Sequence, residues 1–227
     1  MFEGFPKDAI TFFKKLSENN NRDWFAENKP WYEESVREPA LALVTDMQGP
    51  LKKVSPFFLA VPKRSGGSLM RIYRDIRFSR NKTPYKTNLG VHFRHEGGKD
   101  AHAPGFYFHF DTEEVFVGAG MWRPANPILN QIRALIDDDP KRWKRIKNGK
   151  KFKTTFELRG ESLKRPPRGY DENHALIDDL KRKDHFSMSK LTPADLLDRT
   201  LIDKLVERFK TAKPYVRFLC DSIHVPC

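Results

Sequence analysis

The sequence predicts an α+β fold in which one domain, residues 1–227, carries a mainly antiparallel sheet with helices before and after it. Apolar residues recur at helical spacing near both ends of the chain, and several segments between them alternate with the two-residue period of a strand. No internal repeat or low-complexity linker divides the chain. With 38% apolar residues and 18 Phe, 227 residues suffice for one substantial core.

Residues 1–52 are predicted to form the helical N-terminal part. Apolar side chains recur at helical spacing between Ile10 and Leu16, and a second apolar stripe follows in "RDWFAENKPWYEESVREPALALVTDMQ". Pro30 suits the start of a helix, whereas Pro39 is expected to kink or end one near Glu38. The glycines and prolines between residues 49 and 67 then predict a loop.

Residues 68–160 are predicted to hold the sheet with one inserted helix. Residues 70–78 alternate apolar and polar side chains, which predicts a half-buried strand, although Arg74 falls on the apolar side. A buried guanidinium needs a carboxylate or several acceptors around it. Further strands are expected in "NLGVHFRH", "GFYFHFD", "EEVFVGAGMW" and "KFKTTFEL", with a hairpin at "DTEE".

Helices are expected in two later segments. Asn126 is predicted to cap a helix that has Pro127 at its first position. Residues 190–224 are predicted to form the C-terminal helices, because Thr192 is a good N-cap with Asp195 three positions later. Pro214 is expected to kink or divide this last helical segment.

The positive charge is concentrated in two blocks of the chain. The formal net charge is +12, but residues 63–99 alone carry +8 and residues 141–168 carry +10, so the rest of the chain is acidic. A solvated basic surface is the simplest interpretation of such blocks. Local positive potential also attracts phosphates, carboxylates and nucleic acid.

The densest cationic stretch is "RIYRDIRFSRNKTPYK", residues 71–86, with six cations and one acid. Arginine offers a planar fork of donors that matches a carboxylate or phosphate, and lysine adds a mobile point charge. The stretch therefore predicts an anion-binding site, to which the second block adds two cations. The predicted anion-binding residues are Arg71, Arg74, Arg77, Lys82, Lys86, Lys164 and Arg165.

Candidate proton carriers lie in and near this stretch. Asp75 and Tyr85 belong to it, and His109 alternates with Tyr107 and Asp111 onto the polar side of a predicted strand. These considerations single out Asp75, Tyr85 and His109 as catalytic candidates, while a structural ion pair is an equal alternative for Asp75. The spacing of His109 and Asp111 offers only two ligands, so no metal site is predicted.

The pattern Arg71-x-x-Arg74-Asp75-x-Arg77-Phe78-x-x-Asn81-Lys82-x-x-Tyr85 resembles the signature of the bacterial family known as domain of unknown function 2461. The resemblance extends over nearly the whole chain, through "FFKKLSENNNRDWFAENK", "GAGMWRP" and "LKRPPRGYD". It implies a shared fold and marks the signature as the distinguishing feature of the family. It assigns no catalytic role to any residue.

Several classes of protein lose support. The chain has no phosphate-binding loop, dinucleotide fingerprint, nucleophile elbow or Cys-x-x-Cys pair, so most common enzyme classes lose support and the cofactor is unknown. Its two cysteines are expected to be reduced thiols. No apolar stretch approaches the roughly 18 residues of a membrane span and no signal peptide is recognisable, so we expect a cytoplasmic protein.

Two functions fit these observations, and a purely structural or partner-docking role is a third alternative that the sequence leaves open. The first is the binding of a small molecule that carries a phosphate or carboxylate in an Arg/Lys-rich pocket, with or without catalysis. The second is the binding of nucleic acid, with the two basic blocks forming one face and aromatic side chains stacking on bases. The compact signature favours the first, whereas the partner, the oligomeric state and any reaction are left open by the sequence.

Overall fold

The structure, a computed structural model, describes residues 1–98 and 102–227. Within these residues, one antiparallel sheet has the strand order β1-β2-β3-β5-β4. The strands are β1 (Leu89–Arg94), β2 (Gly105–Phe110), β3 (Val115–Met121), β4 (Glu157–Arg159) and β5 (His185–Leu191). The predicted hairpin joins β2 to β3, where the side chain of Asp111 accepts hydrogen bonds from the backbone N–H groups of Glu113 and Glu114.

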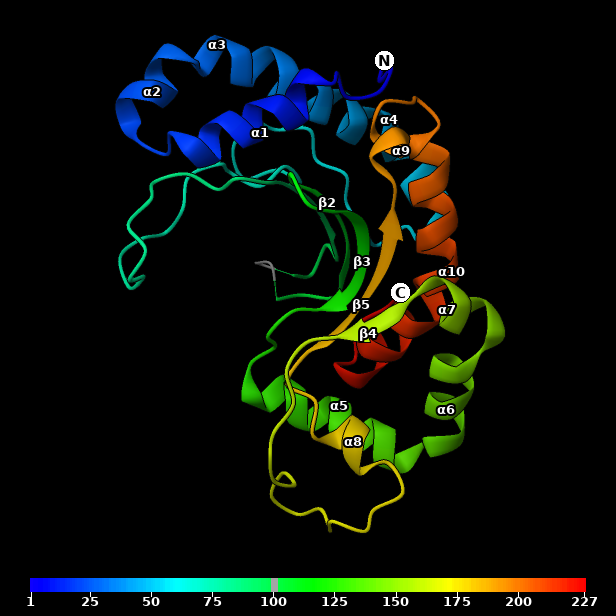
Figure 1. Ribbon diagram of the computed structural model, residues 1–227. Helices are drawn as coiled ribbons and strands as arrows, with labels where there is room; N and C mark the ends of the chain where they lie inside the picture. The colour runs from blue at the N-terminus through cyan, green and yellow to red at the C-terminus, as the bar shows by residue number, and fades with distance from the viewer. Residues whose placement is uncertain (99–101) are drawn as a thin grey trace.

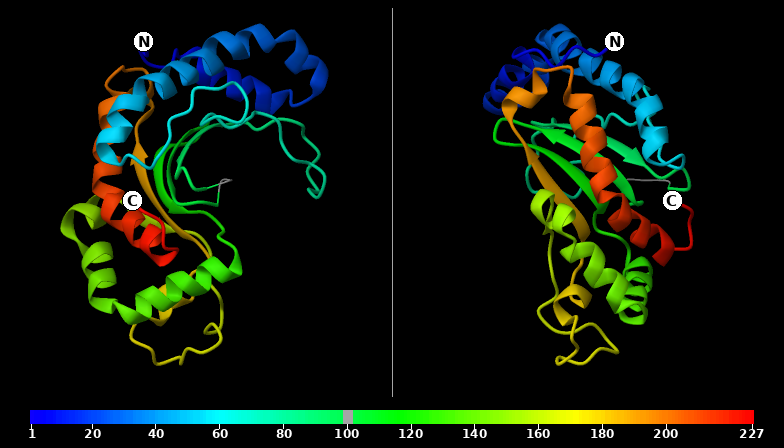
Figure 2. Two further views of the ribbon diagram at one scale, coloured as in Figure 1. Left: turned by 180° about the vertical axis from the view of Figure 1, so that it is seen from behind. Right: turned by 90° about the vertical axis from the view of Figure 1, so that its right-hand side faces the viewer.

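One face of the curved sheet carries the core. Alternate residues of β1, β2 and β3 point to this face, where they meet the long helix α10 (Leu201–Ser222) and its neighbour α4 (Glu38–Val54) (Figure 1). The Phe209 ring of α10 stacks on Phe106 of β2 at 4.5 Å and lies 5.6 Å from Phe93 of β1. The opposite face of the sheet opens toward the irregular segment between α4 and β1 (Figure 2).

The N-terminal helices cover one end of the sheet. They are α1 (Asp8–Glu18), α2 (Arg22–Glu27), α3 (Lys29–Tyr32) and a π-helical turn (Glu33–Arg37) that leads into α4. Phe13 of α1 and Phe5, which precedes it, pack against Phe110 with ring centroids 5.7 and 4.9 Å away. The helical N-terminal part therefore shares its core with the sheet.

Further helices surround the other end of the sheet. They are α5 (Asn126–Asp138), α6 (Pro140–Asn148), α7 (Lys150–Thr155) and α8 (Ile177–Leu180). The short helix α9 (Pro193–Leu196) lies instead near the N-terminus, where the Phe5 N–H donates to the Leu196 carbonyl oxygen. Trp143 of α6 is fully buried and packs against Phe218 and Tyr215 of α10. The described chain thus forms one α+β domain with terminal helices, which confirms the predicted fold class.

Several predicted elements were wrong in detail. Residues 70–78 form no regular strand, because this segment makes only isolated bridges at Leu69 and Tyr73. Most of the predicted strand at 151–158 is helix α7, since Phe152 and Phe156 are also spaced as one helical turn. The sheet extends to β5, which lies beyond the predicted sheet region of residues 68–160.

Helix ends also differ from the predictions. Helix α4 continues through Gly49 and Pro50 to Val54, although a loop was predicted there. Asn126 is the first residue of α5 rather than its cap. The predicted capping box of Thr192 and Asp195 is present, but the chain leaves the helix after Leu196 and re-enters it at Leu201. Pro214 lies inside the continuous helix α10 and does not divide it.

Among the described helices, we found none with the length and apolar character required to span a membrane.

Candidate functional site

The open face is defined here as the sheet face turned away from α4 and α10. Strand alternation directs Gly90 and His92 of β1, Tyr107 and His109 of β2, and Phe186 of β5 onto this face. Their opposite neighbours, such as Phe106 and Phe108, point into the core. The same strands therefore supply stability on one face and aromatic and titratable groups on the other.

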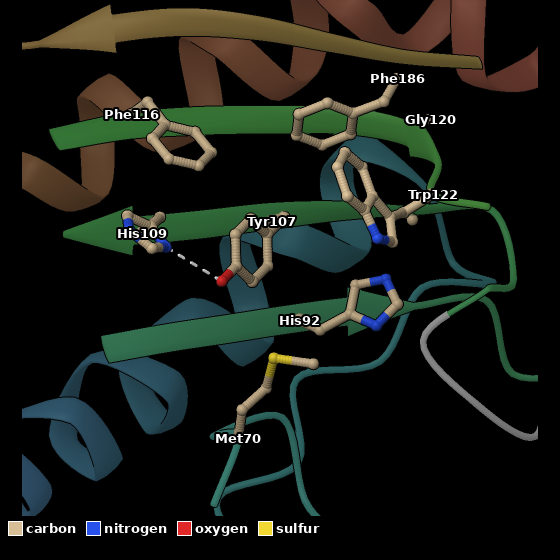
Figure 3. Close-up of a pocket in the computed structure, with 9 residues that line it drawn as sticks. Met70, His92, Tyr107, His109, Phe116, Gly120, Trp122 and Phe186 are labelled. Carbon is tan, nitrogen blue, oxygen red and sulfur yellow. Dashed lines mark hydrogen bonds between the residues drawn. The ribbon is translucent and has the colours of Figure 1, made fainter. Parts of the chain in front are cut away.

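A cavity of about 320 Å³ lies on the open face. It is lined by Met70, His92, Gly105, Tyr107, His109, Phe116, Gly120, Trp122 and Phe186 (Figure 3). The volume suits a small molecule. Trp122 and Phe186 stand at one end with ring centroids 5.7 Å apart, and His109 stands at the other.

Glycines make room for the rings of this cavity. A Cβ atom at Gly90 would lie 2.4 Å from the Tyr107 hydroxyl oxygen, and one at Gly105 would lie 2.4 Å from Nε2 of His92. A Cβ atom at Gly118 would lie equally close to the Phe186 ring. Aromatic side chains can therefore lie flat across neighbouring strands, where larger residues would push them away from the sheet.

Tyr107, His109 and Asp111 form a continuous hydrogen-bonded row along β2 and its end. The Tyr107 hydroxyl lies 3.1 Å from Nδ1 of His109, and Nε2 of His109 lies 3.3 Å from Oδ2 of Asp111 (Figure 3). A carboxylate only accepts hydrogen bonds, so the Asp111 contact places the imidazole proton on Nε2 and leaves Nδ1 as an acceptor. Tyr107 then donates its hydroxyl proton to Nδ1, which also receives a longer contact, 3.4 Å, from the Asn88 amide.

The protonation states agree with this direction of donation. Burial lowers the pKa of His109 and outweighs the opposing effect of Asp111, so the imidazole is neutral at pH 7. Burial raises the pKa of Tyr107, and the Asp111 charge adds to the effect, so the phenol keeps its proton. Burial acts to raise the pKa of Asp111, but hydrogen bonds from Glu113, Glu114 and His109 prevail and lower it.

Residues 71–88, called the arm from here on, contain the whole cationic signature and project beside the open face (Figures 1 and 2). The base of the arm is fixed by Tyr85, whose ring stacks on Phe25 at 4.1 Å and whose backbone makes two hydrogen bonds to the side chain of Asn20. The Phe78 side chain, near the tip, is 96% exposed. The predicted burial of Phe78 in a strand was therefore wrong.

Three cations of the arm bind to the arm itself. Arg77 forms a two-point ion pair with Asp75 at 3.0 and 2.7 Å, and this hydrogen bonding lowers the pKa of Asp75 to about 2. The Arg74 guanidinium donates to the Thr83 hydroxyl at 2.5 Å, and Lys82 donates to the Ile76 carbonyl oxygen at 2.9 Å. These contacts shape the arm, and Asp75 is held in its ion pair away from the cavity.

Arg71 and Lys86 differ from these three. Burial lowers the pKa of Lys86, and the charge of Arg71 lowers it further, so the two cations lie close enough to repel each other. Neither forms an ion pair within the described ranges. Arg71 follows Met70, which lines the cavity and donates its backbone N–H to Gly90, and Lys86 lies two residues before Asn88, which contacts His109.

The other predicted site residues lie elsewhere. Lys164 and Arg165 are exposed in the loop between β4 and α8, at the far end of the molecule from the arm. Helices α6 and α7, which carry most of the second basic block, lie on the other side of the sheet from the arm. The two blocks therefore do not form the single basic face that was predicted.

Of the three catalytic candidates, only His109 reaches the cavity. The Tyr85 ring is buried against Phe25, and burial raises the pKa of its hydroxyl. Lys82 lines a different, shallow cavity of about 410 Å³ between the arm and α2, together with Asn20, Asn21, Arg22, Ile76, Thr83 and Pro84. The predicted anion-binding cations therefore do not share one pocket.

Sequence reasoning placed Tyr107 and Asp111, with His92 and His109, on the polar side of the sheet as possible proton carriers, but it selected only His109 of these four as a catalytic candidate. The available signal was the Tyr-x-His-x-Asp spacing, which puts three such groups on one strand face. The aromatic wall of Trp122 and Phe186 carried no recognisable signal, because Trp122 follows β3 and Phe186 belongs to β5, far away in the sequence. Within the described ranges, no group of three or more His, Cys, Asp or Glu side chains is arranged to hold a metal ion.

Comparison with known proteins gives a family. Residues 8–218 match the family model described as "Conserved hypothetical protein (DUF2461)". No curated protein and no solved structure matches the chain. Because the match spans most of the 227 residues, the chain belongs to the DUF2461 family.

Proposed function

We propose that the cavity on the open face binds a small molecule that carries a phosphate or carboxylate group. The observation that supports this most directly is the difference between the two ends of the cavity. Trp122 and Phe186 form an aromatic wall at one end, and Tyr107 and His109 place polar groups at the other. Aromatic walls with a few placed polar groups are typical of small-molecule sites. The aromatic end suits a planar, apolar ligand body.

The anionic group of this ligand is assigned to the cations at the base of the arm. Arg71 and Lys86 repel each other, and within the described residues neither forms an ion pair, although the charge of Arg71 also acts on the more distant Asp75. Binding an anion between the two cations would offset their repulsion. The proposal thus keeps the predicted ligand class, but it uses two signature cations at the base of the arm instead of the whole cluster.

The test is thermal stabilisation by two simple aromatic anions, phenyl phosphate and benzoate, with neutral phenol as the reference. A ligand at one hundred times its Kd stabilises the folded state by about 2.7 kcal/mol, so an anion that binds raises the unfolding midpoint. The Arg71→Gln/Lys86→Met double variant should lose the stabilisation, whereas Lys144→Met, an exposed charge on α6, should keep it.

Two results would contradict the proposal. The first is that neither anion raises the unfolding midpoint more than phenol does. The second is that the anions stabilise the double variant as much as the unmodified protein.

A second candidate is the binding of single-stranded nucleic acid by the arm. Phe78 is almost fully exposed, the Arg77 guanidinium lies 5.8 Å from its ring, and Arg80 and Lys82 follow without an intervening acid. An exposed ring among cations suits stacking on a base beside phosphates. Titration of a fluorescent oligonucleotide at several salt concentrations tests this, because binding should weaken steeply with salt and with Phe78→Ala.

A further inference from the structure

We propose that Tyr107 is a catalytic nucleophile that His109 activates and Asp111 positions, for the cleavage of small carboxylic esters in the cavity. This inference rests on the ligand-binding role proposed above for the same cavity. It starts from one geometric fact: three side chains from alternate positions of one strand face form a hydroxyl–imidazole–carboxylate row.

The row has the hydrogen-bond direction that proton transfer from a hydroxyl to an imidazole requires. Because burial keeps the phenol protonated and the imidazole neutral at rest, this transfer has to accompany the attack on the substrate. Asp111 accepts from Nε2 of His109, so the lone pair of Nδ1 faces the Tyr107 hydroxyl at 3.1 Å. In hydroxyl–histidine–carboxylate catalysis, the carboxylate fixes the imidazole tautomer and stabilises the imidazolium that forms as the nucleophile attacks. Asp111 is itself fixed, because its other oxygen accepts two backbone hydrogen bonds in the β2–β3 turn.

The packing around the row restricts its motion. The His109 ring stacks on Phe116 with centroids 4.5 Å apart and planes at 20°. The Tyr107 hydroxyl lies over Gly90, and a side chain at position 90 would displace the hydroxyl. Tyr107 and His109 both line the cavity, so a bound ligand would contact the two residues that this hydrogen bond joins (Figure 3).

The chemistry balances without a metal or an external reductant. The Tyr107 oxygen attacks the ester carbonyl carbon, its proton moves to Nδ1 of His109, and the ester C–O bond breaks. His109 gives this proton to the ester oxygen as the C–O bond breaks, so a neutral alcohol leaves and an acyl group remains on Tyr107. Water then attacks this acyl group, gives one proton to His109, and releases the carboxylic acid as the proton returns to the Tyr107 oxygen.

The lining of the cavity favours acyl over phosphoryl transfer. Phosphoryl transfer depends on cations placed around the transferred group to offset its charge. Among the described residues that line the cavity, none is Lys or Arg, and Arg71 and Lys86 belong to the arm beside the open face. These two cations are therefore assigned to a remote anionic group of the substrate and not to the reacting carbonyl.

The nucleophile can be tested without knowledge of the natural substrate. The probe is 4-(fluorosulfonyl)benzoate. The phenol oxygen of a tyrosine attacks the sulfur atom of the probe, fluoride leaves, and the phenolic proton passes to a base. Benzenesulfonyl fluoride is its neutral counterpart. Mass spectrometry of the labelled peptides gives the rate at Tyr107 and, as a reference in the same molecule, at Tyr73, which is 47% exposed.

We expect Tyr107 to be sulfonylated at least tenfold faster than Tyr73. His109→Gln should reduce the Tyr107 rate to that of Tyr73, whereas His174→Gln, which breaks the separate His174–Asp137 pair, should leave it unchanged. Equal rates at the two tyrosines, or an unchanged Tyr107 rate in His109→Gln with a normal unfolding midpoint, would overturn the proposal.

The role of Asp111 has its own measurement. Asp111→Asn keeps an oxygen for the backbone N–H groups of Glu113 and Glu114 but presents an N–H donor to Nε2 of His109. The imidazole proton should then move to Nδ1, which ¹⁵N NMR of the ring detects, and Tyr107 labelling should fall. Unchanged ring shifts together with unchanged labelling would show that Asp111 does not position His109.

The two probes separate this inference from the binding role. Faster labelling of Tyr107 by the benzoate than by its neutral counterpart supports both. Equal, fast labelling by the two probes supports the nucleophile and contradicts the anion site. Labelling by neither contradicts the nucleophile, while the thermal shift with benzoate still reports on binding.

Discussion

Gly90 determines where the Tyr107 hydroxyl can lie. A methyl group there would sit 2.4 Å from the hydroxyl oxygen and 3.1 Å from two ring carbons, so Gly90→Ala must move the ring. We expect the sulfonylation rate of Tyr107 to fall to that of Tyr73 and the free energy of unfolding to decrease by about 1–3 kcal/mol, as for overpacked sites.

Gly49→Ala is the matched control for this substitution. Its methyl group meets no atom within 4 Å in helix α4, so the variant should be slightly more stable and keep the labelling rate. Rapid labelling of Tyr107 in Gly90→Ala would mean that the hydroxyl position is not critical.

His185 should make the protein sensitive to acid. The ring is fully buried on the core face of β5, its two nitrogens have no hydrogen-bond partner in the described part of the chain, and Trp143 lies 6.0 Å away. Burial, assisted by the charges of Arg182 and Arg133, lowers the pKa of His185 from 6.5 to about 3. As the pH falls from 6.5 to about 3, His185 binds a proton in the unfolded chain but not in the folded chain, so the free energy of unfolding decreases.

His185→Leu measures this loss. Between pH 6.5 and about 3, the unfolding free energy of the unmodified protein should fall more steeply than that of the variant, by up to about 1.4 kcal/mol per pH unit. Urea unfolding at pH 7, 5.5 and 4 gives the two slopes. Parallel slopes would exclude His185 as the group responsible.

At the scale of elements, the side chain of Asn20 links the arm to the N-terminal helices, in addition to the stacking of Tyr85 on Phe25. Asn20 donates to the Tyr85 carbonyl oxygen at 3.0 Å and accepts from the Tyr85 N–H at 3.1 Å. Asn20→Ala removes both contacts and should speed hydrogen exchange across residues 71–88, with a loss of about 1–2 kcal/mol in local stability. Exchange in β2 and β3 should be unaffected.

Asn19→Ala serves as the control, because its side chain donates only to the Lys15 carbonyl oxygen at the end of α1. Equal exchange in the arm of both variants would show that Tyr85 is held by ring stacking on Phe25 alone.

Strands were predictable where alternation coincided with burial. In β2, Phe106, Phe108 and Phe110 alternate with Tyr107 and His109, and both the strand and its polar side followed from the sequence. In β5 the buried positions include Ser187 and Ser189, so polar residues occupy the core face and hide the pattern. The arm shows the opposite case: apolar and polar residues alternate in its sequence, but the described residues form only an isolated bridge there, between Tyr73 and Tyr85, and no regular strand.

The site was less predictable than the fold. A strand period shows that His109 and Asp111 share a face, but not which imidazole nitrogen meets which partner. Nor does it show that Asp75 holds Arg77, two residues away. This segment was predicted as a strand but is irregular, and an irregular backbone directs the two side chains differently. Contacts between strands, such as Trp122 with Phe186, depend on register, which one chain's local pattern does not contain.

At the scale of the whole molecule, helices from both ends of the chain meet on one sheet face, so we predict that the domain unfolds as a single unit. Phe209→Ala, which removes the ring stacked on Phe106, should cost about 3–5 kcal/mol and shift the entire transition. Calorimetry should show one peak in the unmodified protein and in the variant.

Phe78→Ala removes the same number of atoms from a 96% exposed position and should change the free energy of unfolding by less than about 0.5 kcal/mol. Two separate calorimetric peaks, one of them insensitive to Phe209→Ala, would indicate two independent domains.

In the part of the chain that the structure describes, the long helices α4 and α10 pack on one face of the sheet, so the same strands carry two nearly independent sets of positions. Replacing Tyr107 or His109 need not disturb Phe106 or Phe108, which keep the protein folded. Relatives with the same scaffold are therefore free to acquire different ligands or reactions by exchanging residues at every second position.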